Sequence, residues 1–294
     1  MFDAAPVSAP VPLQQSEAFH RALAAFGRTP ERLACGTLVL HRTFGPLPVR
    51  MIVRPRAQTV FDMHRLLERL PGRGPVILSP DAPMPLGQLG ALPVVSPTTV
   101  AWLDLSPGED ALMAGLHQKW RNRLRHAQRQ ELRISRQNLP DDPSHWLLQM
   151  DAQQQRARRY RSWPPALTRA FARANPSQAK LFTARLGGNP VSALLLLRHG
   201  EVASYHIGHT GPLGRLTSAQ TLLMWQAILW ARRKGMRRLE LGTLDTEEGA
   251  GRARFKLGTG AVTQRLGGTW IYAPALRPLA RPLARLDRAL MAGT

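Results

Sequence analysis

A strand, a glycine-containing turn and a long helix follow one another in the second half of the chain. The strand is expected over residues 202–209, the turn over 211–215 and the helix over 217–234. The first N–H groups of a helix have no partner within the helix and point outward, so a turn that leads into a helix suits an anion. The pattern predicts a site for the pyrophosphate of an acyl carrier. A plain strand-to-helix turn is the alternative.

Side chains able to move a proton lie on the flanking strands. Acyl transfer to an amine needs a held donor, groups that stabilise the oxyanion and a route for the amine's proton. Tyr205 and His206 precede the turn, and Glu240 lies on a strand expected over 238–242. Neighbouring strand residues point to opposite faces. We therefore expect at most one of Tyr205 and His206 to line a cleft, with His209 on the face of Tyr205. A purely structural histidine is the alternative for His206.

An acidic loop follows that second strand. It contains Asp245, Glu247 and Glu248, which are suited to receive an amino acceptor. No Ser-His-Asp set, His-Glu-x-x-His motif or phosphate-binding loop motif appears, so hydrolase and NTPase functions have no support. The single cysteine, Cys35, excludes an intrachain disulfide framework and a cysteine metal cluster, and no metal site is expected.

Apolar periodicity and turn residues predict the elements that position these groups. Helices are expected at 14–26, 60–70, 146–160 and 167–174, and strands at 36–41, 48–53, 76–79, 98–105, 180–186, 191–198 and 261–272. Residues 80–97 are rich in Pro and Gly and are expected to be irregular, with one helical turn. Ser106 and Glu109 form a capping-box pattern that predicts the start of a further helix.

Positive charge is the outlier of the composition. Forty Lys and Arg face nineteen Asp and Glu, a net charge of +21, and seven of the basic residues lie between Lys119 and Arg136. One interpretation is a solvated helix face. Adjacent arginines repel one another in a helix, however, which favours an anionic partner. The substrate-binding candidates on this helix are Trp120, Arg121 and Arg125.

Length and hydropathy set the remaining limits. A chain of 294 residues suggests two domains. No apolar run approaches the ~18 residues of a membrane-spanning helix, and the first residues lack the pattern of a secretory signal. A cytoplasmic protein is therefore expected. The tail, 274–294, has a basic amphipathic pattern, which predicts packing on a domain or peripheral association with an anionic membrane surface.

The order of these elements resembles the acyl-CoA N-acyltransferase (GNAT) superfamily, and within it the FemAB-like proteins and BioF2-like acetyltransferase domains. The segments that carry the resemblance are 11–19, 72–76, the basic stretch 119–124 and the pair Phe255–Lys256. It implies an α/β fold with two tandem GNAT-like domains. These are expected at 1–105, reduced in form, and at 136–273, catalytic, joined by a basic helix at 106–135.

The resemblance also implies roles for single residues. Gly211, Gly214, Arg215, Ser218 and Ala219 stand where the superfamily grips the donor's pyrophosphate. The pattern departs from the superfamily at 216–218, where a final glycine is expected. Phe255 and Lys256 match a pair near the transferred carbonyl in the tRNA-dependent branch, so Lys256 is expected to stabilise the oxyanion. A solvated surface lysine is the alternative.

The expected function is N-acyl transfer from a carrier to an amine. Acyl-CoA is the preferred donor, because it is the commoner carrier in the superfamily. Aminoacyl-tRNA, used on a peptidoglycan precursor or similar amine, is the alternative, and the basic segment favours it. A non-catalytic nucleic-acid-binding module is a third possibility, and it predicts salt-sensitive RNA binding.

Overall fold

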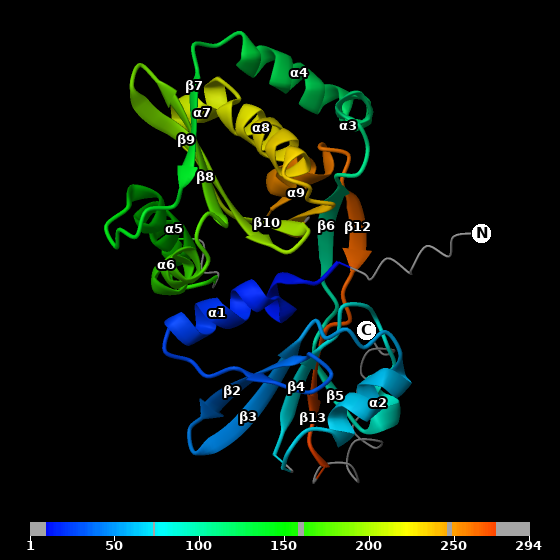
Figure 1. Cartoon of the computed structure of the whole chain (residues 1–294). Helices are drawn as coiled ribbons and strands as arrows, with labels where there is room; N and C mark the ends of the chain where they lie inside the picture. The colour runs from blue at the N-terminus through cyan, green and yellow to red at the C-terminus, as the bar shows by residue number, and fades with distance from the viewer. Residues whose placement is uncertain (1–9, 73, 158–161, 246–248, 275–294) are drawn as a thin grey trace, which may run out of the picture. The chain divides into compact units, whose positions relative to one another are not determined.

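The computed structural model describes residues 10–72, 74–157, 162–245 and 249–274. Within these limits the chain folds into two compact units. The larger unit comprises residues 10–26 and 101–263, and the smaller unit comprises residues 27–100 and 264–274. Each unit contains one mixed sheet with helices packed on it (Figure 1). The expected α/β class with two sheet-containing domains is confirmed.

The described part of the larger unit has a seven-stranded sheet. In spatial order its strands are β12 (Val262–Arg265), β6 (Thr99–Asp104), β11 (Arg238–Thr243), β10 (Val202–Thr210), β9 (Asn189–His199), β8 (Ala179–Leu186) and β7 (Arg133–Asn138). Strands β7 to β10 pair antiparallel, whereas β10 and β11 run parallel. The β8–β9 hairpin turns through Gly187 and Gly188, whose positive φ angles glycine adopts without strain.

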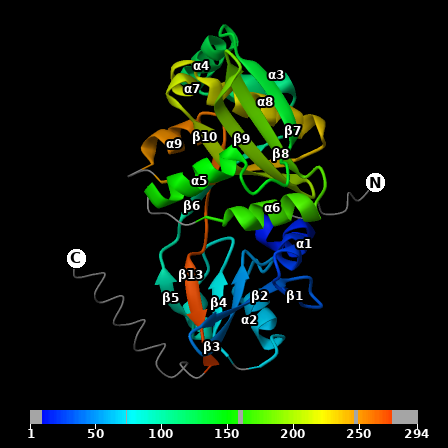
Figure 2. The same ribbon diagram turned by 90° about the vertical axis from the view of Figure 1, so that its left-hand side faces the viewer.

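Helices cover both faces of this sheet. The helices that follow β6 and β10 are α3 (Glu109–Gly115), α4 (Gln118–Gln128), α7 (Pro212–Leu216) and α8 (Ala219–Arg233), and those elsewhere are η1 (Leu13–Gln15), α1 (Glu17–Ala25), α5 (Trp146–Ala157), α6 (Pro165–Ala174) and α9 (Ala250–Leu257). Figures 1 and 2 show α8 and α4 on one face, and α5 and α6 on the other. Both faces of the sheet are thus covered, which explains why residues 193–197 of β9 form a continuous apolar run.

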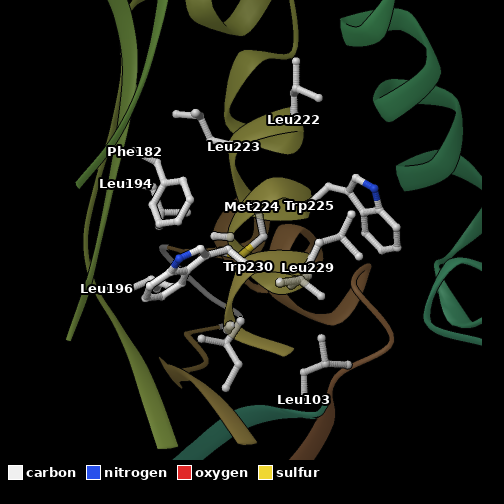
Figure 3. Packing of buried hydrophobic residues seen from close by; sticks show 14 of the residues in the cluster. Leu103, Phe182, Leu194, Leu196, Leu222, Leu223, Met224, Trp225, Leu229 and Trp230 are labelled. Atoms are coloured by element: carbon white, nitrogen blue, oxygen red, sulfur yellow. The ribbon is translucent and has the colours of Figure 1, made fainter. Parts of the chain in front are cut away.

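The core of the larger unit is built around α8. Its residues Leu223 and Trp230 are almost fully buried, and Trp230 meets the edge of Phe182 from β8 at 5.7 Å between ring centroids (Figure 3). On the side away from the sheet α8 packs against α4. Each large apolar side chain buried in this way contributes roughly 1.5–3 kcal/mol. The helix that follows the predicted donor turn is therefore held firmly in place.

The helix expected over 106–135 is shorter and divided. The chain adopts an extended conformation at Leu116, so α3 and α4 are separate, and β7 begins at Arg133. The predicted capping box is wrong. The N–H and hydroxyl groups of Ser106 both donate to the Asp104 carboxylate at 2.9 Å, and Gly108 is the N-cap of α3. Ser106 therefore forms its hydrogen bonds with a nearby carboxylate instead of capping the helix.

The smaller unit has a six-stranded sheet among its described residues. In spatial order the strands are β1 (Glu31–Arg32), β2 (Leu38–Phe44), β3 (Leu47–Val53), β4 (Val76–Ser79), β13 (Thr269–Tyr272) and β5 (Leu92–Val95), accompanied by α2 (Val60–Glu68) and η2 (Leu86–Leu89). The stretch 80–97, expected to be irregular, contains η2 and also β5. Thr59 and Asp62 form a capping box at the start of α2.

The division of the chain differs from a split at residue 105. Residues 10–26 belong to the larger unit, because Phe19 of α1 stacks on Trp163 at 5.1 Å and the Asn175 side chain donates to the Ala18 carbonyl at 2.9 Å. The strand expected over 261–272 is two strands. Gly268 interrupts it with φ +74°, so β12 joins the larger sheet and β13 lies between β4 and β5.

The amphipathic tail predicted over 274–294 lies outside the described residues from 275 onward. Among the helices that the structure does describe, none combines the length and the apolar character needed to cross a lipid bilayer.

Candidate active site

Two parallel strands diverge at the centre of the larger sheet. β10 and β11 pair only where Val202–Ser204 face Arg238–Glu240. Both strands continue beyond this point, and a chamber of about 1140 Å³ opens between their carboxyl ends. We call it the strand-end chamber. Its lining residues are Asp151, Gln154, Ala157, Ser162, Tyr205, His206, Ile207, Gly208, Leu241, Gly242, Thr243, Asp245, Gly249, Gly251, Arg252 and Lys256.

A β-bulge in β10 changes the faces on which its side chains lie. The pairing with β9 shifts between Tyr205 and Ile207. The extra residue places the Tyr205 ring over Gly208, where an added Cβ would lie 1.7 Å from the tyrosine oxygen. His206 and His209 instead contact Trp163 and Trp146 from the opposite face.

Two predictions about β10 are therefore wrong. His209 does not share the face of Tyr205, because the bulge resets the alternation. Tyr205 and His206 also both line the strand-end chamber, because the diverging strands open it to both faces of the sheet. The expectation that neighbouring residues take opposite faces still holds for Tyr205 and His206 themselves.

His206 is a partly buried imidazole that is neutral at pH 7. Its Nε2 is 2.9 Å from the Thr168 hydroxyl, and the edge of Trp163 packs against its ring at 4.8 Å between centroids. Burial lowers the pKa of His206 to about 4. A base this weak has little proton affinity at neutral pH. The environment therefore favours the structural alternative for His206 over a role as general base.

Tyr205 is fixed by the first turn of α8. Its hydroxyl lies 3.1 Å from the side-chain amide of Gln220. The amide orientation that satisfies all its neighbours has the Gln220 nitrogen donating to Ser192 and to the His209 carbonyl, and its oxygen accepting from Tyr205. Gln220 thus ties β9, β10 and α8 together beside the chamber.

Lys256 projects from α9 into the strand-end chamber. Its Nζ donates to the Thr243 carbonyl at 2.7 Å. Burial, and secondarily the positive charge of Arg252, lower the pKa of Lys256 to about 8. Gly242, with φ +78°, lies beside the ammonium, since a Cβ added there would be 3.7 Å from Nζ. The site thus holds a positive charge close to the carboxyl end of β11.

Helix α4 holds the last turn of α9. The Trp120 indole N–H donates to the Phe255 carbonyl at 3.1 Å, and the His117 N–H donates to the Gly258 carbonyl at 3.0 Å. Gly258 is packed so closely that an added Cβ would lie 2.5 Å from the Trp120 ring. Trp120 is 4% exposed, so the prediction that it binds substrate is not supported by its position. Its contacts instead position Phe255 and Lys256.

A second chamber adjoins the first. It has a volume of about 520 Å³ and is lined by Arg123, Gln154, Tyr205, Gly208, His209, Thr210, Gly214, Arg215, Ser218, Gln220, Thr221, Gly251, Arg252 and Phe255. We call it the arginine chamber, because Arg123, Arg215 and Arg252 are among its described lining residues. No carboxylate is among its described lining residues. Five described residues line both chambers, namely Gln154, Tyr205, Gly208, Gly251 and Arg252. This arrangement suits a ligand that carries phosphate at one end.

The predicted donor turn is a short helix rather than an open loop. Gly211 is the N-cap of α7 and donates its N–H to the Val191 carbonyl at 3.0 Å. The N–H groups of Arg215 and Ser218 also donate to protein carbonyls. In this conformation these three backbone N–H groups are therefore not available to bind the phosphates of a donor. Of the five predicted residues, Gly214, Arg215 and Ser218 line the arginine chamber, whereas Gly211 and Ala219 do not.

The remaining predicted substrate residues separate into two groups. Asp245 lines the strand-end chamber and pairs with Arg252 at 3.4 Å, and Glu247 and Glu248 lie outside the described residues. Three others are absent from the lining of both chambers, because their side chains are used elsewhere. Arg121 donates to the Ala114 and Leu116 carbonyls, Arg125 lines a groove with α3, and Glu240 pairs with Arg238 at 3.7 Å.

Arg123 lines the arginine chamber and Asp151 lines the strand-end chamber, although neither was predicted as a site residue from the sequence. Arg123 belongs to the basic cluster on α4, and helix packing alone decides which of its arginines reaches the cavity. Asp151 has a sequence signal, since it is the only acidic residue between Asp142 and Glu201. Its carboxylate accepts from the Gln155 amide at 2.7 Å, and burial raises its pKa.

The chain is similar to one domain family and to several solved structures. Residues 115–257 match the acetyltransferase (GNAT) domain family. The structure of FemX covers 95% of each chain with a TM-score of 0.72 and 13% identity. The C-terminal domain of a protein described as a lysylphosphatidylglycerol synthetase from Agrobacterium fabrum covers 93% of each chain, with a TM-score of 0.54 and 14% identity. L-PGS from Bacillus licheniformis covers 94% of this chain and 96% of its own, with a TM-score of 0.52 and 13% identity.

At such identities the solved structures show a common fold and nothing finer. No curated protein matches the chain by sequence. The resemblance to the GNAT superfamily and to FemAB-like proteins, expected from the order of sequence segments, is confirmed.

Proposed function

Because residues 115–257 match the acetyltransferase (GNAT) domain family, we propose that this protein is an N-acyltransferase that moves an acyl group from a phosphate-bearing carrier to an amine. The observation that carries the proposal is the junction of two unlike chambers. One is lined by three arginines, and the other contains a lysine and two carboxylates. A carrier's phosphates fit the first, and the acyl group and acceptor fit the second.

The donor end of the site is electrostatic. Arg123 from α4, Arg215 from α7 and Arg252 from α9 come from three separate elements to one cavity. Guanidinium groups bind phosphate through paired N–H donors. Arg252 already pairs with Asp245 of the adjoining chamber, whereas no described carboxylate forms an ion pair with Arg123 or Arg215. Gly214 allows α7 to approach β9, since an added Cβ would lie 2.3 Å from the Val191 carbonyl oxygen. Acyl-CoA is the preferred carrier, because the matched family is one of acetyltransferases.

Lys256 supplies the cation beside the reacting carbonyl. When the amine nitrogen attacks the acyl carbon, a C–N bond forms and negative charge develops on the carbonyl oxygen. With a pKa of about 8, Lys256 is roughly nine-tenths protonated at pH 7. An ammonium held by the Thr243 carbonyl is already in place when that charge appears, so little reorganisation is needed. Collapse of the oxyanion then breaks the bond to the carrier.

Aminoacyl-tRNA is the second candidate donor, and the surface of α4 favours it. Lys119, Arg125 and Arg129 are exposed on the helix that delivers Arg123 to the arginine chamber. A basic helix surface next to a phosphate-binding cavity would serve a carrier far larger than CoA. In this case the acceptor remains an amine, such as that of a peptidoglycan precursor, and Lys256 keeps the same role.

Thermal unfolding with acetyl-CoA, CoA and bulk tRNA tests the proposal. A ligand that binds the native state raises its melting temperature by mass action, so the true carrier produces a rise that grows with concentration. A rise with acetyl-CoA and CoA supports the preferred donor, and a rise with tRNA alone supports the second. No rise with any of them contradicts both. Salt-sensitive RNA binding without any transfer activity would indicate the nucleic-acid-binding module instead.

A further inference from the structure

Asp151 stands out among the acidic residues of the larger unit. It lies on α5, in a segment between Asp142 and Glu201 that holds eight arginines, one lysine and no other acid. The side chain is partly buried and lines the strand-end chamber next to Gln154. The amide of Gln155, one helical turn later, donates to its carboxylate at 2.7 Å. Asp151 therefore faces a cavity with its carboxylate oriented by a neighbour.

No described lysine or arginine forms an ion pair with Asp151, in a chain where positive charges outnumber negative ones two to one. Asp245 is the other carboxylate among the described lining residues, and it already pairs with Arg252. Asp141 pairs with Arg169 at 2.7 Å. A carboxylate that is partly withdrawn from water without a cation is costly. Burial accordingly raises the pKa of Asp151. A cationic ligand would remove this cost.

We propose that Asp151 is the residue that binds the acceptor's amino group in the strand-end chamber. This inference rests on the proposed acyl transfer. Among the described lining residues, the other ionisable groups do not compete for this role, and the Tyr205 hydroxyl is bonded to the Gln220 amide. Lys256 and Arg252 are cations and repel an ammonium, Asp245 is paired with Arg252, and His206 remains neutral at pH 7.

Asp151 also provides the route for the amine's proton. The bound ammonium first releases one proton to solvent. The resulting neutral amine attacks the acyl carbon, the C–N bond forms, and the carbonyl electron pair moves to oxygen beside Lys256. The new nitrogen centre loses its extra proton to the Asp151 carboxylate. The carbonyl re-forms, the C–S or C–O bond to the carrier breaks, and the leaving atom takes a proton from the Lys256 ammonium. Solvent then removes the proton from Asp151 and restores that of Lys256, so charge and protons balance.

Carbon-13 NMR of aspartate-labelled protein tests the assignment without a known substrate. The Asp151 carboxyl signal is identified as the one missing from Asp151→Asn. Titration with n-butylamine and cadaverine, both primary ammonium probes at neutral pH, is expected to move this signal with saturation. Asp151→Asn is expected to weaken probe binding about tenfold or more, since hydrogen bonds to charged groups are the stronger class. Asp151→Glu keeps the charge and is expected to retain binding.

Two controls make the result specific. Tetramethylammonium has the same charge and no N–H donor, and it is expected to bind weakly. Asp110→Asn removes an exposed acid of α3 outside both chambers, so it changes net charge equally and should leave probe binding unaltered. An Asp151 signal that is unmoved by millimolar amine, or equal binding by Asp151→Asn, would overturn the inference. Carrier binding is measured separately in the arginine chamber, so failure of one proposal is distinguishable from failure of the other.

Discussion

At the scale of single residues, Lys256 combines a charge, a fixed position and a lowered pKa. We expect Lys256→Ala to reduce kcat by about a hundredfold or more, the usual effect of removing one group that stabilises an oxyanion. Affinity for the carrier should change little, because Lys256 does not line the arginine chamber. Lys256→Arg should restore part of the rate. Steady-state kinetics with the carrier identified by thermal unfolding checks these values.

Arg254→Ala is the matched control for that substitution. Arg254 is exposed on the same helix and is absent from the lining of both chambers, so its removal should leave kcat within about twofold. If Lys256→Ala and Arg254→Ala slow turnover equally, Lys256 has no special role, and the solvated lysine of the alternative interpretation is correct.

The pKa of Lys256 also sets a pH dependence. The oxyanion needs the protonated lysine, so kcat/KM should fall as pH rises through about 8. Lys256→Arg keeps its charge throughout this range and should remove the fall. A pH profile of both proteins from pH 6 to pH 10 decides the point. The same decline in Lys256→Arg would mean that another group causes it.

The lowered pKa of Lys256 affects stability in the opposite direction: kcat/KM should fall as pH rises, whereas the free energy of unfolding should increase. Partial burial lowers the pKa of Lys256 below its ordinary value of 10.5, so below about pH 8 the native protein carries a partly buried charge at a cost. Between about pH 8 and 10.5 the native lysine loses its proton while the unfolded one keeps it, and the cost declines. We therefore expect Lys256→Met to gain melting temperature relative to the wild type at pH 7, and less so at pH 10.

At the scale of elements, α4 and α9 act together through Trp120. Trp120→Phe keeps the apolar packing but leaves the Phe255 carbonyl without the indole N–H donor. Loss of a buried hydrogen bond of this kind costs about 1–3 kcal/mol. The free energy of unfolding from urea titration should fall by that amount, and kcat should fall because Lys256 follows Phe255 directly. Trp225→Phe is the control, since Trp225 is equally buried in the same core.

The comparison separates positioning from general stability. If Trp120→Phe and Trp225→Phe lower kcat in proportion to their stability alone, α4 only supports the fold. A kcat decrease confined to Trp120→Phe, with an unchanged KM for the carrier, indicates that the helix orients Lys256.

Gly214 fixes the contact between α7 and β9. An alanine there would place its Cβ 2.3 Å from the Val191 carbonyl oxygen and 2.6 Å from the Thr210 hydroxyl. Relief of the first contact requires the backbone of β9 or α7 to move, which costs free energy. Overpacking of this kind costs about 1–3 kcal/mol, so Gly214→Ala should lower the melting temperature and weaken carrier binding. Gly115→Ala adds a Cβ that meets nothing within 4 Å and should be close to neutral. Equal melting temperatures for the two variants would contradict this account of the turn.

The elements of the larger unit could largely be predicted from sequence, because periodicity reports burial. The run from Ala193 to Leu197 is fully buried in β9, as an apolar strand covered on both faces must be. The site could be predicted less well. The bulge after Tyr205 has no marker in the residue types, and it decides which side chains share a face. The selection of Arg123 rather than Arg125 depends on how α4 packs, which no local pattern records.

At the scale of the whole molecule, the excess of positive charge affects every anionic ligand. A net charge of +21 strengthens polyanion binding at low salt without selecting among polyanions. The logarithm of tRNA affinity should fall steeply with the logarithm of salt concentration, because many phosphates release counterions. CoA carries few phosphates, so its affinity should fall much less. Filter binding and calorimetry across a salt series give both slopes, and a tRNA affinity independent of salt would exclude binding through the basic surface.

The most direct measurement compares two arginines of one helix. Arg123 and Arg125 lie two residues apart on α4, but only Arg123 lines the arginine chamber. Calorimetric titration of acetyl-CoA, or of tRNA if tRNA alone raises the melting temperature, should give a Kd at least about tenfold weaker for Arg123→Ala. Arg125→Ala should change it less than about twofold. Equal weakening by both variants would mean that the general field, and not this chamber, holds the carrier.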